Sequence, residues 1–327
     1  MNEPPRKRSF RAPALAVLAL AAALSALSFP GCASAPPSQV AQQWYDLGNA
    51  WLDKGDWKKA GEAYSRAIAL NPSFAGASFN LARALVEAGD YDGAIDILSV
   101  LARRDPENIR IVSAKAYALY KKGDPVKALA AYKEALKLDP YSPDAIYNAA
   151  LLELASGDAV SATADLDKLV AAKSDDGQAY LLLGRARDKL SQADEASSPR
   201  ARAEALASFD RDQAVQAFEK AETLGKADAD GLERLAALYG ARRQFDEQMS
   251  ALEATVKLDP KRGADWFTLA RLRLIVASDS DKGMDALKSA LDAGFADKDE
   301  AAALLAEPDL PDRAKVLELL KTKSLAQ

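Results

Sequence analysis

Hydrophobic residues between positions 41 and 294 recur at helical spacing in blocks of about 34 residues. In the first block, Leu47 and Trp51 lie one turn apart, and this spacing predicts that both face a second helix. The polar break Gly55-Asp56 predicts the end of the first helix and the cap of the second. Pro72 predicts the end of the second helix, because proline cannot continue one. We therefore expect each block to form two helices joined by a short turn.

Proline pairs define the period of the blocks. Asn71-Pro72, Asp105-Pro106 and Asp139-Pro140 follow one another at equal intervals of one block. Three further periods would place the next pair at positions 241–242, but it occurs at Asp259-Pro260. The chain therefore holds an excess of about 18 residues, or half a repeat. The fifth block is interrupted between its two halves, so we place the extra residues within residues 190–210.

This insertion is rich in alanine and charge. Ser198-Pro199 is a favourable helix start, so the second helix of the fifth block is expected to begin near Pro199 and to project beyond its neighbours. The insertion is either a tolerated surface extension or a contact for a partner or a second copy. A smaller irregularity occurs in the seventh block, which has one extra residue in its turn.

The first block resembles the tetratricopeptide repeat, in which Trp-x-x-Leu-Gly is followed by Ala-x-x-x-Phe/Tyr-x-x-Ala and then by proline. The residues that carry the resemblance are Trp44, Leu47, Gly48, Ala60, Tyr64, Ala67 and Pro72. Weaker versions of the pattern recur in the later blocks. The resemblance implies an all-α fold, a right-handed α-solenoid of about seven helix-turn-helix units.

The chain divides into five segments on these patterns. Residues 1–31 are assigned to an export signal peptide and residues 32–40 to a tether. Residues 41–176 are assigned to units 1–4, and residues 177–294 to units 5–7 with the insertion. Residues 295–327 are expected to form a C-terminal helical cap, because terminal units of a solenoid need a polar outer face.

The N-terminal segment has the pattern of an export signal. A basic stretch up to Arg11 precedes an uncharged apolar stretch, residues 12–29, and the sole cysteine, Cys32, follows Pro30-Gly31. The arrangement resembles a bacterial lipoprotein signal, which implies cleavage before Cys32, its acylation (palmitate among the acyl chains), and anchoring to a membrane of the cell envelope. Ala33 then favours the outer membrane, facing the periplasm. A plain secretory signal and a retained anchor are the alternatives.

Composition argues against most catalytic and metal sites. The chain has no histidine and one cysteine, which excludes the Ser-His-Asp triad, histidine-containing metal sites and cysteine zinc clusters. The formal charge is −5, and it becomes −8 without the basic N-terminal segment, so a nucleic-acid partner is not expected. We predict no enzyme, no cofactor and no metal, although paired carboxylates leave one catalytic alternative open.

The resemblance implies a concave groove, lined by the first helix of each unit, that binds a protein or peptide. Tyrosine and arginine are frequent at the energetic centres of interfaces, and asparagine can pair with a peptide backbone. The predicted partner-binding residues are Tyr45, Asn49, Phe79, Asn80, Arg83, Arg110, Tyr117, Tyr120, Tyr147 and Asn148.

Two functions remain open at this stage. The first is a lipid-anchored scaffold that organises partner proteins at the cell envelope through this groove. The second is a transport accessory lipoprotein in complex with a periplasmic solute-binding protein. Some relatives in the family hold a ligand's C-terminal carboxylate with five basic or amide residues, and Asn49, Asn80 and Arg110 are the partial counterparts here.

Overall fold

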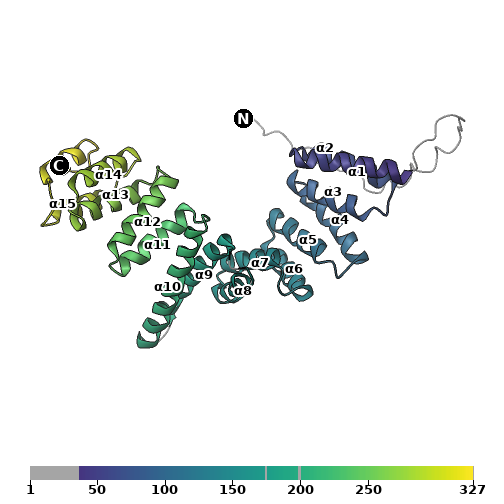
Figure 1. The fold of residues 1–327 in the computed structure, drawn as a ribbon, viewed down its shortest axis with the longest axis horizontal. Helices are drawn as coiled ribbons and strands as arrows, with labels where there is room; N and C mark the ends of the chain where they lie inside the picture. The colour runs from purple at the N-terminus through teal and green to yellow at the C-terminus, as the bar shows by residue number, and fades with distance from the viewer. Residues whose placement is uncertain (1–36, 174, 198–199, 327) are drawn as a thin grey trace, which may run out of the picture. The chain divides into compact units, whose positions relative to one another are not determined.

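The computed structural model describes residues 37–173, 175–197 and 200–326, and within these ranges it contains sixteen α-helices, one π-helical turn and no strand (Figure 1). The helices form successive hairpins in the solenoid-like arrangement expected for tetratricopeptide repeats. They fall into two compact units, the first ending at Pro140 and the second beginning at Tyr141. The predicted signal peptide, including Cys32, lies outside the described residues.

The first unit contains three hairpins. Its helices are α1 (Pro37–Asp53), α2 (Trp57–Leu70), α3 (Ala75–Glu87), α4 (Tyr91–Arg104), α5 (Ile109–Lys122) and α6 (Pro125–Leu138). Each helix packs against the next one along the chain from α1 to α6.

The second unit contains the remaining repeats and the C-terminal helices. Its elements are α7 (Pro143–Ser156), α8 (Ala159–Ala172), α9 (Gly177–Ser197), α10 (Arg200–Thr223), α11 (Ala229–Ala241), α12 (Phe245–Leu258), α13 (Gly263–Arg271), η1 (Leu272–Val276), α14 (Ser280–Asp292), α15 (Lys298–Ala306) and α16 (Arg313–Lys321). None of the helices in the described part of the chain has both the length and the apolar character needed to cross a bilayer.

Turns within the hairpins follow the Gly-Asp signal. Gly55, Gly89, Gly123 and Gly157 have φ of 72°, 84°, 89° and 90°, a left-handed conformation that glycine adopts without steric cost. The following aspartate caps the second helix; Asp56, for example, accepts a hydrogen bond of 3.1 Å from the backbone N–H of Lys59. The predicted end of α1 and the predicted cap of α2 are thus confirmed.

Close helix packing in the first hairpin depends on small residues. Ala60 is fully buried, and a Cβ atom added to Gly48 would lie 2.5 Å from Cε1 of Tyr64. Trp51 is partly buried against this cluster, as expected. The prediction for Leu47 is wrong, because its side chain is 41% exposed. No described helix precedes α1 to cover it.

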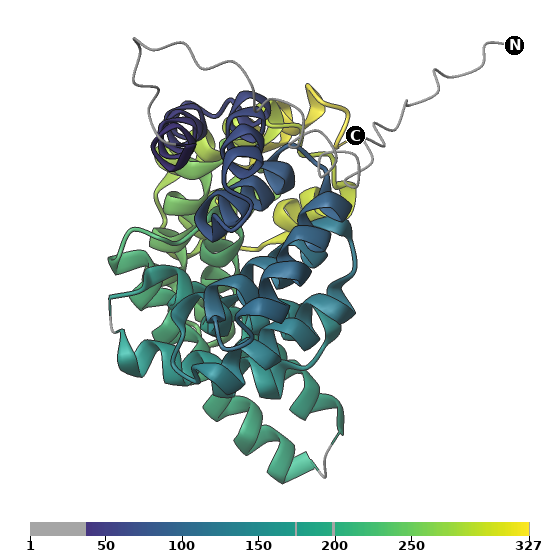
Figure 2. The same ribbon diagram turned by 90° about the vertical axis from the view of Figure 1, so that its right-hand side faces the viewer.

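The insertion lengthens both helices of the fifth hairpin. α9 has 21 residues and α10 has 24, whereas the helices of the next hairpin, α11 and α12, have 13 and 14. α10 begins at Arg200, next to the predicted start. The hairpin extends beyond its neighbours α8 and α11 in Figure 1, and Figure 2 shows the two long helices from another side.

The extra residue of the seventh repeat is accommodated by a π-helical turn. α13 continues directly into η1, and the N–H of Ala277 donates to the carbonyl of Leu272, five residues earlier. A π turn accommodates one residue more than an α turn, so α14 still packs against α13. The C-terminal helices α15 and α16 then extend the core of the unit through Leu304 and Leu320.

Candidate functional site

A polar network joins the first three helices on the face of the predicted groove. The hydroxyl of Tyr64 donates to Oδ1 of Asn49 at 2.8 Å, and Nδ2 of Asn80 donates to the same oxygen at 3.0 Å. Nδ2 of Asn80 also donates to the hydroxyl of Tyr45 at 3.2 Å. Burial raises the pKa of Tyr64 to about 12, so its hydroxyl keeps its proton near neutral pH. The network therefore fixes three predicted site residues, Tyr45, Asn49 and Asn80.

This network argues against a carboxylate clamp. Both amide protons of Asn80 are engaged within the protein, and its remaining polar atom, Oδ1, is an acceptor that repels a carboxylate. Oδ1 of Asn49 already accepts two hydrogen bonds. Both asparagines thus stabilise the stacking of α1, α2 and α3, and of the two only Asn49, through Nδ2, keeps donors for an anion.

A pocket of about 220 Å³ lies beside the network, within the first unit. It combines residues of four helices, α1, α3, α4 and α5, which come together only when successive hairpins stack. Its lining is formed by Tyr45, Ala75, Gly76, Phe79, Asn80, Leu101, Asn108, Arg110 and Ile111. Four predicted residues, Tyr45, Phe79, Asn80 and Arg110, therefore share one cavity.

Arg110 supplies the positive charge of the pocket. Its guanidinium lies 5.3 Å from the centre of the Phe79 ring, in a cation–π arrangement. The side chain is exposed, and within the described part of the chain it has no acidic partner. A guanidinium that lies over an aromatic ring and has no counterion can form an ion pair with a carboxylate of a ligand.

The remaining predicted residues of the first unit lie outside this pocket. Tyr117 is seven residues after Arg110, on the same side of α5, but its ring packs partly buried against the core around Leu98. Tyr120 is 40% exposed and Arg83 is exposed. These three side chains do not line the cavity with Arg110.

Tyr147 and Asn148 belong to the second unit. Nδ2 of Asn148 donates to the backbone carbonyl of Asp144 at 2.7 Å, and burial raises the pKa of Tyr147. The side-chain amide of Asn148 thus forms a hydrogen bond within its own helix, α7. Their role in partner binding stays a prediction.

Sequence reasoning missed part of the lining. Leu101 is a consensus core position, and Asn108 precedes α5, where its amide donates to Asp105 at 2.8 Å. Neither position is exceptional in the sequence. Only the packing of α4 and α5 against α3 shows that they form one wall of the pocket.

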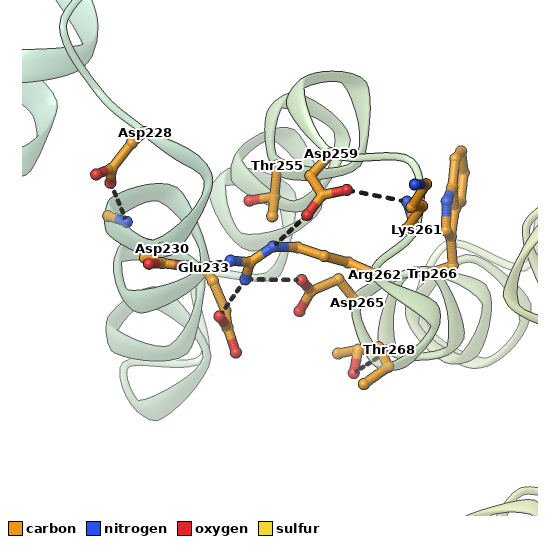
Figure 3. Close-up of polar contacts among 12 residues, drawn as sticks. Asp228, Asp230, Glu233, Thr255, Asp259, Lys261, Arg262, Asp265, Trp266 and Thr268 are labelled. Atoms are coloured by element: carbon orange, nitrogen blue, oxygen red, sulfur yellow. Dashed lines mark hydrogen bonds and ion pairs between the residues drawn. The ribbon is translucent and has the colours of Figure 1, made fainter. Parts of the chain in front are cut away.

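A polar cluster of the second unit surrounds Arg262 (Figure 3). Its guanidinium pairs with Asp230 and with Glu233, the latter at 2.5 Å, and it lies 3.6 Å from Asp265. Burial, together with the charge of Glu233, raises the pKa of Asp265. Because the carboxylates all surround one guanidinium, the cluster is an ion-pair network that links α11 to α13 and does not resemble a catalytic acid–base pair. Among the described residues no group of histidine, cysteine and acidic side chains could hold a metal ion.

Two models of repeat families match this chain. The model of the cytochrome c-type biogenesis protein H TPR domain matches residues 36–146, and a tetratricopeptide repeat model matches residues 119–186. The chain contains tetratricopeptide repeats.

Solved tetratricopeptide structures have the same fold. A repeat protein from Parabacteroides merdae aligns with a TM-score of 0.52 and 18% identity over 86% of this chain and 98% of its own. PilF of Pseudomonas aeruginosa aligns with a TM-score of 0.56 and 18% identity over 68% of this chain and 94% of its own. At this identity the likeness concerns the fold alone.

Sequence relatives share only part of their length with this chain. A protein of Treponema pallidum described as an uncharacterized lipoprotein is 30% identical over 104 residues, which are 32% of this chain and 53% of that protein. The chain spans between 17% and 53% of the length of the four curated relatives that it matches.

Proposed function

We propose that this protein is a scaffold of the cell envelope, anchored by lipid at Cys32, which binds a partner protein through the pocket of the first unit. The observation that carries the proposal is the convergence of Tyr45, Phe79 and Arg110 on one cavity, with the arginine unpaired among the described residues. Tetratricopeptide repeats characteristically present such surfaces to other proteins.

The pocket suggests the chemistry of the bound segment. A volume of about 220 Å³ suits one apolar side chain, and Phe79, Leu101 and Ile111 offer apolar walls for it. An acidic group beside that side chain would pair with the Arg110 guanidinium, a charge-assisted contact about twice as strong as a neutral hydrogen bond. We therefore expect a partner segment with an apolar anchor next to a carboxylate.

Lipid anchoring rests on the N-terminal pattern and on the relative that is described as a lipoprotein. Two or more acyl chains would hold the protein firmly, because each buried methylene contributes about 0.8 kcal/mol. We expect wild type to sediment with outer-membrane vesicles, and Cys32→Ala to move to the soluble periplasmic fraction. Equal membrane fractions for both proteins would contradict lipidation, as would metabolic labelling with palmitate that is unchanged by the substitution.

The binding proposal is tested by photocrosslinking in native membranes. A benzoylphenylalanine at position 79 places the reactive group inside the pocket, and the same residue at position 121 reports on the exposed end of α5. We expect a discrete crosslinked partner from position 79 that disappears in the Arg110→Glu background. Lys121→Glu is the matched control, because it reverses one exposed charge on the same helix without changing a residue that lines the pocket.

The outcomes separate the hypotheses. Loss of the crosslink in Arg110→Glu, with retention in Lys121→Glu and unchanged circular dichroism, supports binding through the pocket. A crosslink from position 79 that survives both Arg110→Glu and Tyr45→Ala contradicts this assignment. A partner that is a periplasmic solute-binding protein, recovered in equal stoichiometry, would identify the scaffold as the transport accessory of the alternative hypothesis.

A further inference from the structure

A second cavity, of about 530 Å³, lies in the first unit between α4, α5 and α6. Its floor is apolar and contains Ile95 and Ala102 of α4, Val112 and Leu119 of α5, and Ala131 of α6. We call it the α4–α6 groove. It shares no lining residue with the pocket around Arg110, so the first unit has two separate concave surfaces.

The two cavities use opposite sides of α5. An α-helix turns by about 100° per residue, so Lys115 lies about 140° around the helix from Arg110. Leu119 and Lys122 continue the Lys115 side, whereas Tyr117 continues the Arg110 side. A ligand of one cavity therefore need not touch the other.

The α4–α6 groove lies on the most basic hairpin of the first unit. Residues 109–138, which comprise α5 and α6, carry seven lysines and arginines against two acidic residues, whereas the whole chain has a formal charge of −5. Three of these cations, Lys115, Lys122 and Lys127, line the groove together with two acidic residues, Asp124 and Glu134. Each of these acidic residues is paired with a lysine, Asp124 with Lys127 and Glu134 with Lys137. The hairpin is thus a basic region within an acidic protein, and it favours an acidic partner.

Lys115 gives the groove a specific position for an anion. The residue is half-buried over the apolar floor, yet its ammonium has no hydrogen bond or ion pair with any residue that the structure describes. A partly desolvated charge without a counterion is unfavourable, and an incoming carboxylate relieves that cost.

The other two cations can also serve a ligand. Lys122 pairs with Asp92 at 2.5 Å, and Lys127 pairs with Asp124 at 2.7 Å. Asp92 and Lys127 are largely exposed, and Lys122 is about half exposed. Exposed ion pairs contribute little net stability, so their exchange for ligand carboxylates costs little.

We propose that the α4–α6 groove binds an acidic amphipathic segment of a partner protein. Aliphatic side chains at helical spacing would cover Val112, Leu119 and Ala131, and a carboxylate would pair with Lys115. A membrane surface fits less well, because the apolar positions form the floor of a concavity instead of projecting toward a bilayer. The groove and the Arg110 pocket would then bind two segments at once, on opposite sides of α5.

The probe is the labelled peptide acetyl-Leu-Glu-Glu-Leu-Leu-Glu-Glu-Leu-amide, titrated with the full mature chain and followed by fluorescence anisotropy. Comparison peptides replace every glutamate by lysine or every leucine by alanine. The protein variants are Lys115→Glu, Lys115→Met and Lys115→Arg, with Arg110→Glu as the control on the other side of α5. Thermal unfolding of each variant verifies that it is folded.

We expect saturable binding of the acidic leucine peptide, weakened about tenfold or more by Lys115→Glu and less by Lys115→Met. Lys115→Arg and Arg110→Glu should retain it, and both comparison peptides should fail. Absence of binding to wild type would overturn the proposal, as would equal binding to wild type and folded Lys115→Glu. Binding of phosphatidylglycerol vesicles without binding of the peptide would overturn it in favour of a membrane contact. Since Arg110→Glu tests the first pocket separately, failure of one proposal leaves the other standing.

Discussion

The sixth hairpin has a turn that its own sequence does not favour. Between α11 and α12, Arg243 adopts φ of 59°, a left-handed conformation that four other hairpin turns give to glycine. Gln244 occupies the N-cap of α12 but forms no capping hydrogen bond with its side chain. The Gly-Asp pair of the earlier hairpins is therefore replaced by Arg243-Gln244 while the backbone stays the same.

Restoring Gly-Asp here should stabilise the protein. A left-handed conformation costs an L-residue about 1 kcal/mol, and glycine avoids this cost. Glycine also has more conformational freedom in the unfolded chain, which offsets roughly half of the gain. An aspartate at the N-cap contributes about 1 kcal/mol. Arg243 is exposed and has no side-chain partner among the described residues, so removing it loses little. We expect Arg243→Gly with Gln244→Asp to raise the free energy of unfolding by about 1.5 kcal/mol, the sum of the relieved strain and the new cap.

The assay is urea unfolding followed by circular dichroism, with hydrogen exchange of the α11 and α12 amides as a local measure. The reverse exchange, Gly123→Arg with Asp124→Gln, is the control at a turn of favourable sequence. It should lower the midpoint by at least as much as the forward exchange raises it. If the reverse exchange destabilises the protein while the forward one changes neither the midpoint nor local exchange, the turn of the sixth hairpin does not limit stability as argued.

Three further predictions concern helix caps in both units and the packing and hydrogen bonding of the first hairpin. Asp56, Asp124 and Asp279 each accept hydrogen bonds from the lysine that follows three residues later, and these bonds lower the pKa of each carboxyl below the ordinary 3.8. The stabilisation of the folded protein by these carboxylates is therefore present above pH 3.8 and is lost as the pH falls through their pKa values in the folded state. Replacing all three by asparagine, which caps without titrating, should flatten the decline of the unfolding midpoint in acid; an identical decline would contradict this. Gly48→Ala should destabilise the first hairpin by about 1–3 kcal/mol, because its Cβ would meet the buried Tyr64 ring, and an unchanged melting curve would refute the close approach. Tyr64→Phe should cost about 1 kcal/mol through the lost bond to Asn49, but nothing in an Asn49→Ala background; equal losses in both backgrounds would show that the bond contributes nothing.

Local signals determined the hairpins. Gly55-Asp56 and its counterparts act within three or four residues, through a left-handed turn and a cap, so they locate helix ends without knowledge of the rest of the chain. The regular spacing of the proline pairs likewise identified the repeats, and the displacement of Asp259-Pro260 from that spacing located the insertion. Whether the insertion lengthens one helix or two was decided by α9 and α10 themselves.

Stacking between hairpins decided the sites. Asn80 lies far along the chain from Tyr45, and their hydrogen bond, which withdraws the amide from ligand binding, exists only because α3 stacks against the first hairpin. The same stacking encloses Phe79 and Arg110 in one pocket and leaves Leu47 exposed at the first described helix. The sequence by itself determined which residues form helices and where the chain turns, since those preferences depend on near neighbours. Only the tertiary structure decided that the amide of Asn80 is satisfied, because its partners Tyr45 and Asn49 come from the neighbouring repeat, about one period away along the chain.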